Sequence, residues 1–282
     1  LVGSEMCIRD RNNTWAIILG ITAGVFLNGL DLKAVSKSFE AAMSSSTALI
    51  GIIIMAGAGL GQVMTEAHVT HTLVYWIVKR IGVNTQTKAK LVLIICSIVI
   101  CGLLGTLGGG NAVIAPIMIP VMASLGITPT VVAILFKISG EMGLVLGPLT
   151  GVTLITMEVT GLTYGQLMLG AALPFAIIFI GGAWVGALRA QKRTEGQESY
   201  TLSDDMKNLD EIVVTKQETI STVVFLVSFL AMVVYGILTR QGTSYALVVM
   251  MILIAVVSLC ARMHAEHIIS ATVKGAVSYT HL

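Results

Sequence analysis

Two groups of polar and helix-breaking residues interrupt the apolar stretch from 103 to 153. The first group is three glycines and an amide, Gly108, Gly109, Gly110 and Asn111. The second covers 139–151 and includes Ser139, Gly140, Glu141, Pro148 and Thr150. In lipid, irregular backbone is tolerated only where it is buried in protein or lines a cavity. Breaks in neighbouring apolar segments therefore indicate the binding site of a secondary transporter.

Each predicted break can bind ions through its backbone. A broken membrane helix leaves free carbonyls at one half-helix end, which coordinate cations, and free N–H groups at the other, which attract carboxylates. Glycines let a ligand approach the backbone closely, and the Asn111 side chain both accepts and donates hydrogen bonds. The alternative is that the triple glycine only allows tight helix packing.

Glu141 is an ionisable residue in an apolar segment, with Lys137 one helical turn before it. Burying such a charge costs about 2.5–3.5 kcal/mol on insertion scales. We expect Glu141 to carry a proton or to help hold a cation, while Lys137 balances it or meets an anionic substrate. The alternative is a structural ion pair near a helix end. Ser139 and Thr150 are candidate hydroxyl ligands, or they bond back to their own helix.

The composition predicts an integral membrane protein of the all-α class. The chain has 282 residues, of which 55% are hydrophobic and 11% charged, and its mean hydropathy is +0.90. The net charge of +2 gives no reason to expect nucleic acid as a partner. The sequence shows no Ser–His–Asp arrangement, phosphate-binding loop or Cys/His metal spacing. We therefore expect neither an enzyme nor a bound metal or cofactor.

Successive apolar runs predict a multi-pass protein of the cell inner membrane. They cover 15–30, which could complete a span, then 48–63, 91–107 with 112–125 as either a re-entrant hairpin or two spans, and 129–160, 164–188, 219–238 and 245–260. Amphipathic segments are expected at 31–46, 65–82 and 268–276. Basic residues between 79 and 90 and between 189 and 193 place both regions in the cytoplasm. If both clusters are cytoplasmic, 129–160 crosses the membrane once, as a discontinuous helix.

Both ends of the chain look foreign to the protein. Residues 6–10 can be encoded by the DNA word ATG TGT ATA AGA GAC, and its reverse complement reads Val-Ser-Tyr-Thr-His, which is residues 277–281. We expect residues 1–11 and 277–282 to be sequencing-adaptor translations, and the protein to be a fragment. The expected organisation is a first transporter repeat at 12–190, a cytoplasmic linker at 191–218, and the start of a second, truncated repeat at 219–276.

The motif order resembles the first half of carriers in the ion transporter superfamily. A glycine-rich span (51–61) and an amphipathic basic segment precede Leu-Gly-Thr-Leu-Gly-Gly-Gly-Asn (104–111), then Ile119-Pro120, Ser-Gly-Glu (139–141) and Gly147-Pro148. The group includes citrate and dicarboxylate carriers and, more distantly, sodium/proton antiporters of the NhaC type. The resemblance implies an inverted-repeat fold, with a re-entrant hairpin tipped by 108–111 and a discontinuous helix at 139–151.

We therefore predict a cation-coupled secondary transporter of a small organic anion, such as citrate or a dicarboxylate, with Na⁺ or H⁺ as the coupling ion. The first alternative is a sodium/proton antiporter in which Glu141 exchanges the proton. The alternative from another class is a membrane scaffold that transports nothing. The expected partners are the substrate and the lipid bilayer, and a homodimer is a candidate assembly.

Overall fold

The computed structural model describes residues 13–200 and 214–280, and every regular element in these ranges is a helix. This confirms the predicted all-α class. The chain divides into two units, residues 1–49 and residues 50–282, and each is described by itself. The predicted foreign residues 1–11, and residues 201–213 of the predicted linker (191–218), lie outside the described residues.

The first unit contains α2 (Asn13–Leu27) and α3 (Leu32–Met43). Helix α2 has 15 residues, fewer than the roughly 20 that a membrane span needs. The apolar run at 15–30, predicted as a segment that could complete a span, therefore forms a helix of less than span length. The helix is followed by Gly29 at φ +60°. The predicted amphipathic helix is confirmed as α3, which begins where the Asp31 carboxylate accepts a hydrogen bond of 2.8 Å from the Ala34 N–H.

The described residues contain seven helical segments long and apolar enough to cross a membrane. They are Ala48–Glu66, Gln86–Leu104, Leu107–Ser124, Pro129–Leu146, Tyr164–Thr194, Lys216–Leu238 and Thr243–Cys260. These correspond to the predicted spans from residue 48 onward. The predicted segment 129–160 divides into a span-length helix and a shorter apolar one, Gly151–Thr160. The expectation of a multi-span helical membrane protein is confirmed.

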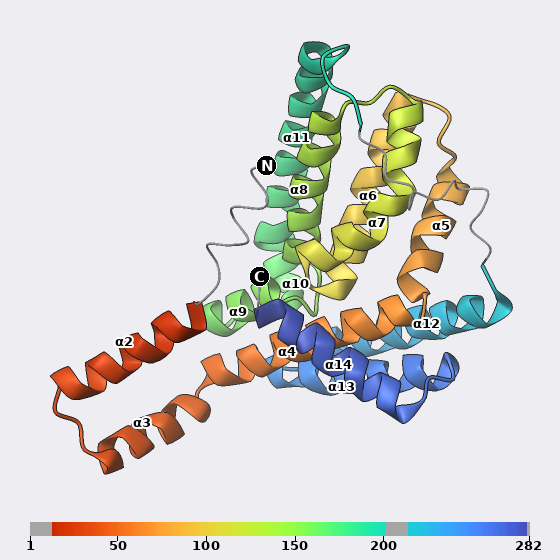
Figure 1. The fold of residues 1–282 in the computed structure, drawn as a ribbon. Coiled ribbons are helices and arrows are strands. Elements are labelled where there is room, and N and C mark those ends of the chain that lie inside the picture. The colour runs from red at the N-terminus through yellow and green to blue at the C-terminus, as the bar shows by residue number, and fades with distance from the viewer. Residues whose placement is uncertain (1–12, 201–213, 281–282) are drawn as a thin grey trace. The chain divides into compact units, whose positions relative to one another are not determined.

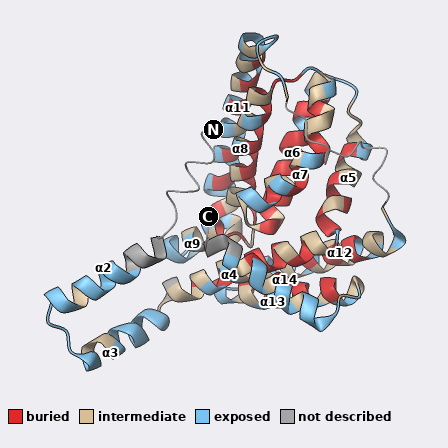
Figure 2. Ribbon diagram, in the orientation of Figure 1, coloured by how far each residue is buried: buried red, intermediate tan, exposed pale blue. Residues whose placement is uncertain are grey.

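A bundle of helices stands side by side in the second unit (Figure 1). Its members are α5 (Val69–Ile81), α6 (Gln86–Leu104), α7 (Leu107–Ser124), α8 (Pro129–Leu146) and α11 (Leu173–Thr194). Other helices run across the lower ends of this bundle in the figure: α4 (Ser46–Glu66), α12 (Lys216–Leu238), α13 (Thr243–Cys260) and α14 (Ala265–Thr280). Buried residues are most frequent on α6, and α4, α5, α8 and α13 each have a larger buried share than α7 does (Figure 2). The core therefore includes the first helix of the predicted hairpin and the helix that precedes the predicted break.

Helix α6 packs against α8 without intervening side chains. A Cβ atom built on Gly143 would lie 2.6 Å from the Ile98 carbonyl oxygen, and one built on Gly147 would lie 2.5 Å from that of Gly102. Gly143 and Gly147 are four residues apart, the small-xxx-small spacing that lets membrane helices approach closely. Because these contacts advance in the same direction along both helices, α6 and α8 are parallel, and α7, which connects them in the sequence, runs back in the opposite direction.

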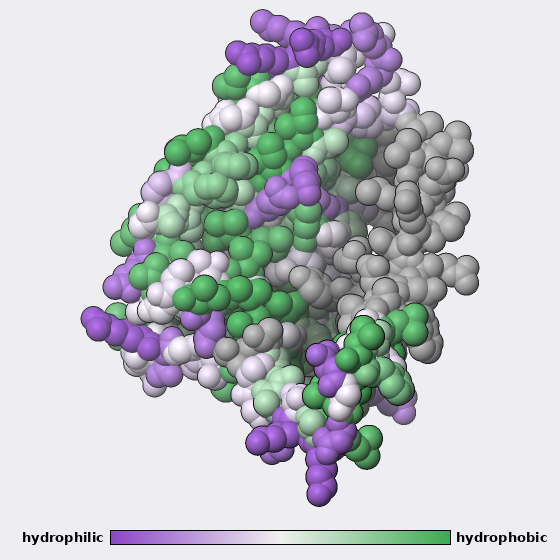
Figure 3. Space-filling model, turned by 90° about the vertical axis from the view of Figure 1, so that its left-hand side faces the viewer, coloured by the Kyte–Doolittle hydropathy of each residue, from purple (hydrophilic) through white to green (hydrophobic). Residues whose placement is uncertain are grey.

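Helix α11 is the last part of one long apolar segment, most of whose side chains are not buried. It follows α10 (Tyr164–Leu167) and a π-helical turn (Met168–Ala172), and the three together run without interruption from 164 to 194. Large apolar side chains are exposed along it, including Leu169, Ile177 and Ile178. Figure 3 shows a broad hydrophobic region on one face of the molecule, with hydrophilic side chains gathered above it and along its lower edge. This pattern is typical of a lipid-facing surface.

Candidate functional site

The turn between α6 and α7 lies a few residues before the predicted hairpin tip. Helix α6 ends at Leu104, Gly105 adopts φ +68°, and Thr106 is the N-cap of α7. The hydrogen bond of 3.0 Å from the Gln86 amide to the Leu125 carbonyl closes the other end of the hairpin. The prediction that Gly108, Gly109, Gly110 and Asn111 form the tip was wrong, because these residues make the first turns of α7. Glycine enters a helix at a cost of only about 1 kcal/mol relative to alanine.

The start of α7 nevertheless presents free donors. The first N–H groups of a helix have no partner within it, and the exposed Gly108 and Gly109 belong to this turn. Gly110 is buried against Cys101. The Asn111 amide oxygen lies 3.7 Å from the Cys101 sulfur and 3.6 Å from a Cβ built on Gly140. Asn111 and Gly140, predicted as parts of separate breaks, therefore lie together between α6, α7 and α8.

The second break is also narrower than predicted. Helix α8 continues through Ser139, Gly140 and Glu141 to Leu146, so these three residues are helical and not part of the break. The break is the four residues 147–150, and α9 (Gly151–Thr160) begins after it with Thr150 as its N-cap. Gly147 and Pro148 stop α8, since proline disfavours the helical conformation of the residue before it.

Hydroxyl groups bind the carbonyl end of α8. The Thr150 hydroxyl lies within hydrogen-bond distance of the Leu144 carbonyl and 3.0 Å from the Gly147 carbonyl. The Thr153 hydroxyl lies 3.1 Å from the Val145 carbonyl, and the Tyr164 hydroxyl donates to the Leu146 carbonyl at 2.8 Å. Thr150 and Thr153 are each 1% exposed. These contacts build a buried group of oxygens at the break, and Thr153 and Tyr164 were not found by sequence reasoning.

The hairpin tip, which is Gly105 and Thr106, lies in contact with the break at 147–150. A Cβ atom built on Gly105 would lie 4.0 Å from the Thr150 Cα. Helix α4 contacts both places: Gly61 lies against Leu104 at the end of α6, and Ile54 lies against Gly151 at the start of α9. Four helix ends therefore converge in one region: the carbonyl ends of α6 and α8, and the N–H ends of α7 and α9. Such ends carry partial negative and positive charge respectively.

Lys137 and Glu141 form the predicted ion pair, with a nitrogen–oxygen distance of 2.7 Å. Their side chains are 64% and 40% exposed, whereas Ser139 and Gly140 on the same helix are buried. The pair therefore lies on the outer face of α8, away from the contact with α6. Ser139 is on the inner face, and its hydroxyl has no hydrogen-bond partner among the described residues.

A pocket of about 130 Å³ adjoins the break on its other side. Pro148 and Leu149 form one wall, Tyr164 another, and the turn between α12 and α13 completes it. Most lining side chains are apolar, and the charged residue among them is Arg240.

Polar contacts fix the opposite end of α8. The Gln191 side chain accepts a hydrogen bond from the Thr128 N–H at 3.2 Å and donates to the Gly126 carbonyl at 2.8 Å. The Glu198 carboxylate accepts hydrogen bonds from the N–H and the hydroxyl of Thr130, which lower the pKa of Glu198. The last turn of α11 therefore meets the first turn of α8. This agrees with the prediction that 129–160 crosses once and 164–188 returns.

The described residues hold no group of three or more His, Cys, Asp or Glu side chains that could bind a metal. Any cation at the break would therefore be held by carbonyl, hydroxyl and amide oxygens. Such oxygens suit hard cations.

One protein-family model matches residues 13–282, nearly the whole chain, and its description is Tripartite ATP-independent periplasmic transporter, DctM component. Neither the search of curated proteins nor the search of solved structures returned a match. The family consists of membrane transporter components of the inner membrane and not of enzymes. The finer likeness to citrate-type carriers and NhaC-type antiporters stays a prediction. By the extent of the match, the chain belongs to the DctM component family of the tripartite ATP-independent periplasmic transporters.

Proposed function

We propose that this chain carries a small organic acid across the membrane by cation-coupled secondary transport. The observation that carries the proposal is the contact between the hairpin tip at Gly105 and the helix break at Thr150. Membrane proteins keep irregular backbone at such depth only where it is enclosed or lines a cavity. Discontinuous helices that meet are how secondary transporters build their substrate and ion sites.

The coupling cation, Na⁺ or H⁺, would bind among the oxygens at the carbonyl ends of α6 and α8. The side chains proposed to take part are the Thr150 and Thr153 hydroxyls, which contact carbonyls at the end of α8, and the Asn111 amide, which lies beside Cys101 of α6. A hydroxyl carries a single proton, so Thr150 satisfies one carbonyl at a time and leaves another lone pair available. The substrate carboxylate would face the N–H ends of α7 and α9, where helix dipoles favour negative charge.

Glu141 is not needed for this proposal. The antiporter alternative assigns it proton exchange, but its carboxylate is paired with Lys137 on the outer face of α8. Its side chain is 40% exposed, whereas the neighbouring Ser139 and Gly140 are buried. The family description names a tripartite system, and we infer that two further components work with this chain.

The test is uptake of radiolabelled succinate and citrate into vesicles that contain this chain with the other components of its system. A sodium gradient and a proton gradient are imposed separately, without ATP. We expect accumulation of an organic acid that needs one of the two gradients. Accumulation independent of both gradients, or none of any organic acid tested, would argue against the proposal. The scaffold alternative predicts no transport under any condition.

A further inference from the structure

An open groove of about 650 Å³ lies between α5 and α6, away from the meeting of tip and break. Its lining combines an aromatic residue, three isoleucines and two cations: Trp76, Ile77, Lys79, Arg80, Ile81 and Ile95. The two cations belong to the last turn of α5, and Ile95 comes from the middle of α6. The groove therefore has a charged upper edge and an apolar floor.

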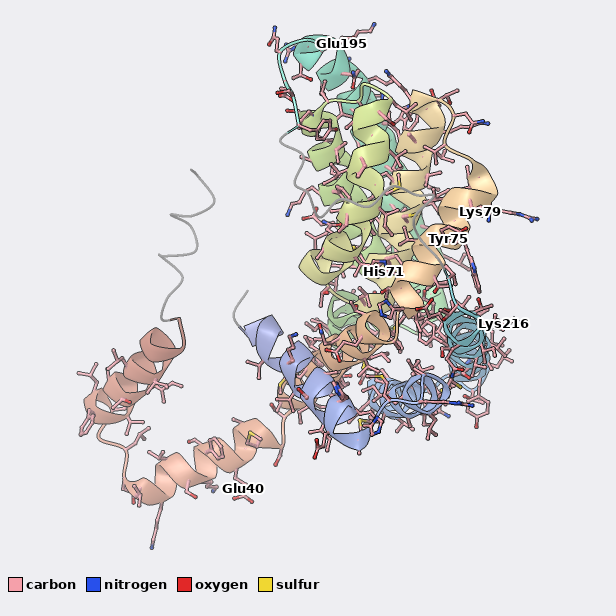
Figure 4. The ribbon with its side chains drawn as sticks, turned by 45° about the vertical axis from the view of Figure 1, so that its right-hand side comes forward. Glu40, His71, Tyr75, Lys79, Glu195 and Lys216 are labelled. Carbon is pink, nitrogen blue, oxygen red and sulfur yellow. The ribbon has the colours of Figure 1, made fainter. Side chains whose placement is uncertain are left out.

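Lys79 is held in place at this edge. Its ammonium donates a hydrogen bond of 3.0 Å to the Tyr75 phenol oxygen and lies 5.2 Å from the centre of the Tyr75 ring. The hydrogen bond raises the pKa of Lys79, so the side chain keeps its charge. Figure 4 shows Tyr75 and Lys79 on the same outward side of α5. Arg80 beside it forms no ion pair with a carboxylate in the part of the chain that the structure describes.

The segment of the sequence that forms the groove carries only positive charges. No Asp or Glu occurs between residues 67 and 140, whereas Lys79, Arg80, Lys88 and Lys90 all fall within α5, α6 and their connection. The positive-inside rule places this connection on the cytoplasmic side. Tryptophan prefers the level of the lipid headgroups, which sets Trp76 at the boundary between the charged edge and the apolar floor.

We propose that this groove binds an anionic phospholipid of the cytoplasmic leaflet. The phosphate contacts Lys79 and Arg80, the glycerol region contacts Trp76, and one acyl chain lies along Ile77 and Ile95. Basic pockets beside membrane helices on the cytoplasmic side recognise anionic headgroups by this combination of charge and apolar surface. The site does not depend on the proposed transport function, because it shares no lining residue with the tip or the break.

The experiment measures quenching of Trp76 fluorescence by brominated lipid. The full chain is reconstituted in phosphatidylcholine vesicles that contain a minor fraction of either brominated phosphatidylglycerol or brominated phosphatidylcholine. The chain has three tryptophans, so Trp76→Phe gives the background from the other two. We expect phosphatidylglycerol to quench Trp76 more strongly than phosphatidylcholine does at the same fraction.

The variant Lys79→Gln/Arg80→Gln should lower the preference for phosphatidylglycerol by roughly fivefold for each cation removed. Both side chains are exposed, and recovery of the monodisperse reconstituted chain checks the fold. The matched control is Lys192→Gln/Arg193→Gln, which removes two cations from the last turn of α11 and should keep the preference. Inorganic phosphate added in excess should leave the quenching unchanged, since it lacks an acyl chain.

Three results would overturn the proposal. Equal quenching of Trp76 by the two brominated lipids would show no headgroup selection. An equal loss of preference in both double variants would show a general effect of charge without a site. Displacement of the lipid by inorganic phosphate would show an anion site that does not hold a lipid.

Discussion

Replacing Gly143 by alanine tests the close packing that brings the tip and the break together. The added Cβ would lie 2.6 Å from the Ile98 carbonyl oxygen and 3.0 Å from the Gly102 nitrogen. Both neighbours are backbone atoms, so the conflict can be relieved only if α6 and α8 move apart. Overpacking of this kind costs about 1–3 kcal/mol.

The control is Gly186→Ala in α11, where a built Cβ meets no atom within 4 Å. Each substitution gains up to about 1 kcal/mol of helix propensity. The difference between the two variants in the free energy of unfolding therefore isolates the overpacking, about 1–3 kcal/mol. Gly143→Ala should be the less stable variant by that amount.

The assay is thermal denaturation of each variant in detergent, followed by the loss of the monodisperse peak in size-exclusion chromatography. The midpoint of Gly143→Ala should lie several degrees below that of Gly186→Ala. Equal midpoints, or a higher one for Gly143→Ala, would refute the backbone contact between α6 and α8.

Two further predictions concern charged side chains outside this contact. Glu198→Gln should loosen the segment after α11 from the start of α8, measured as faster protease cleavage near residue 198. Because the folded pKa of Glu198 is lowered, its contribution is complete above its unfolded pKa of about 4.3 and is lost as pH falls through the folded pKa. The wild type should therefore approach the cleavage rate of the variant in acid, and a constant difference at all pH values would contradict this. Glu141→Gln should retain gradient-driven uptake, since its carboxylate pairs with Lys137 on the outer face of α8; loss of uptake with normal expression would revive the proton-exchange alternative.

The sequence was sufficient to predict most helices of the second unit. Long apolar runs bounded by polar residues are expected to form helices in a membrane, because all backbone groups must be paired within each segment. The same pattern was less reliable at 15–30, where the helix ends at Leu27 and has only 15 residues. There the apolar run continued past Gly29, whose φ of +60° ends the helix.

The positions of the breaks could be predicted only approximately. Glycine and proline indicate irregular backbone but are also tolerated within helices, as Gly108–Gly110, Pro116 and Pro120 are in α7. The better local signal was Gly105-Thr106, a left-handed C-cap residue followed by an N-cap residue. The break after α8 was also predicted to begin too early, because Ser139 and Glu141 are within the helix.

The meeting of the two breaks could not be predicted from the residues themselves. It depends on contacts between residues far apart in the sequence, such as Gly105 with Thr150 and Gly102 with Gly147. The same holds for Gln191 and Thr128 at the other end of α8. A single sequence does not indicate which residue of one helix lies beside which residue of another. It predicted which residues were unusual, and packing determined which of them became neighbours.

The most direct test of the account is the sodium dependence of stability and uptake in a variant of the break. Thr150→Val removes the hydroxyl at the carbonyl end of α8 and keeps the side-chain volume. Thr156→Val is the matched control, because the Thr156 hydroxyl only bonds back to the Val152 carbonyl on α9. If Na⁺ is the coupling ion, NaCl should raise the melting temperature of the wild type and of Thr156→Val above the value in choline chloride, and Thr150→Val should lose both this increase and sodium-driven uptake. A full sodium response in Thr150→Val would contradict a cation site at the break.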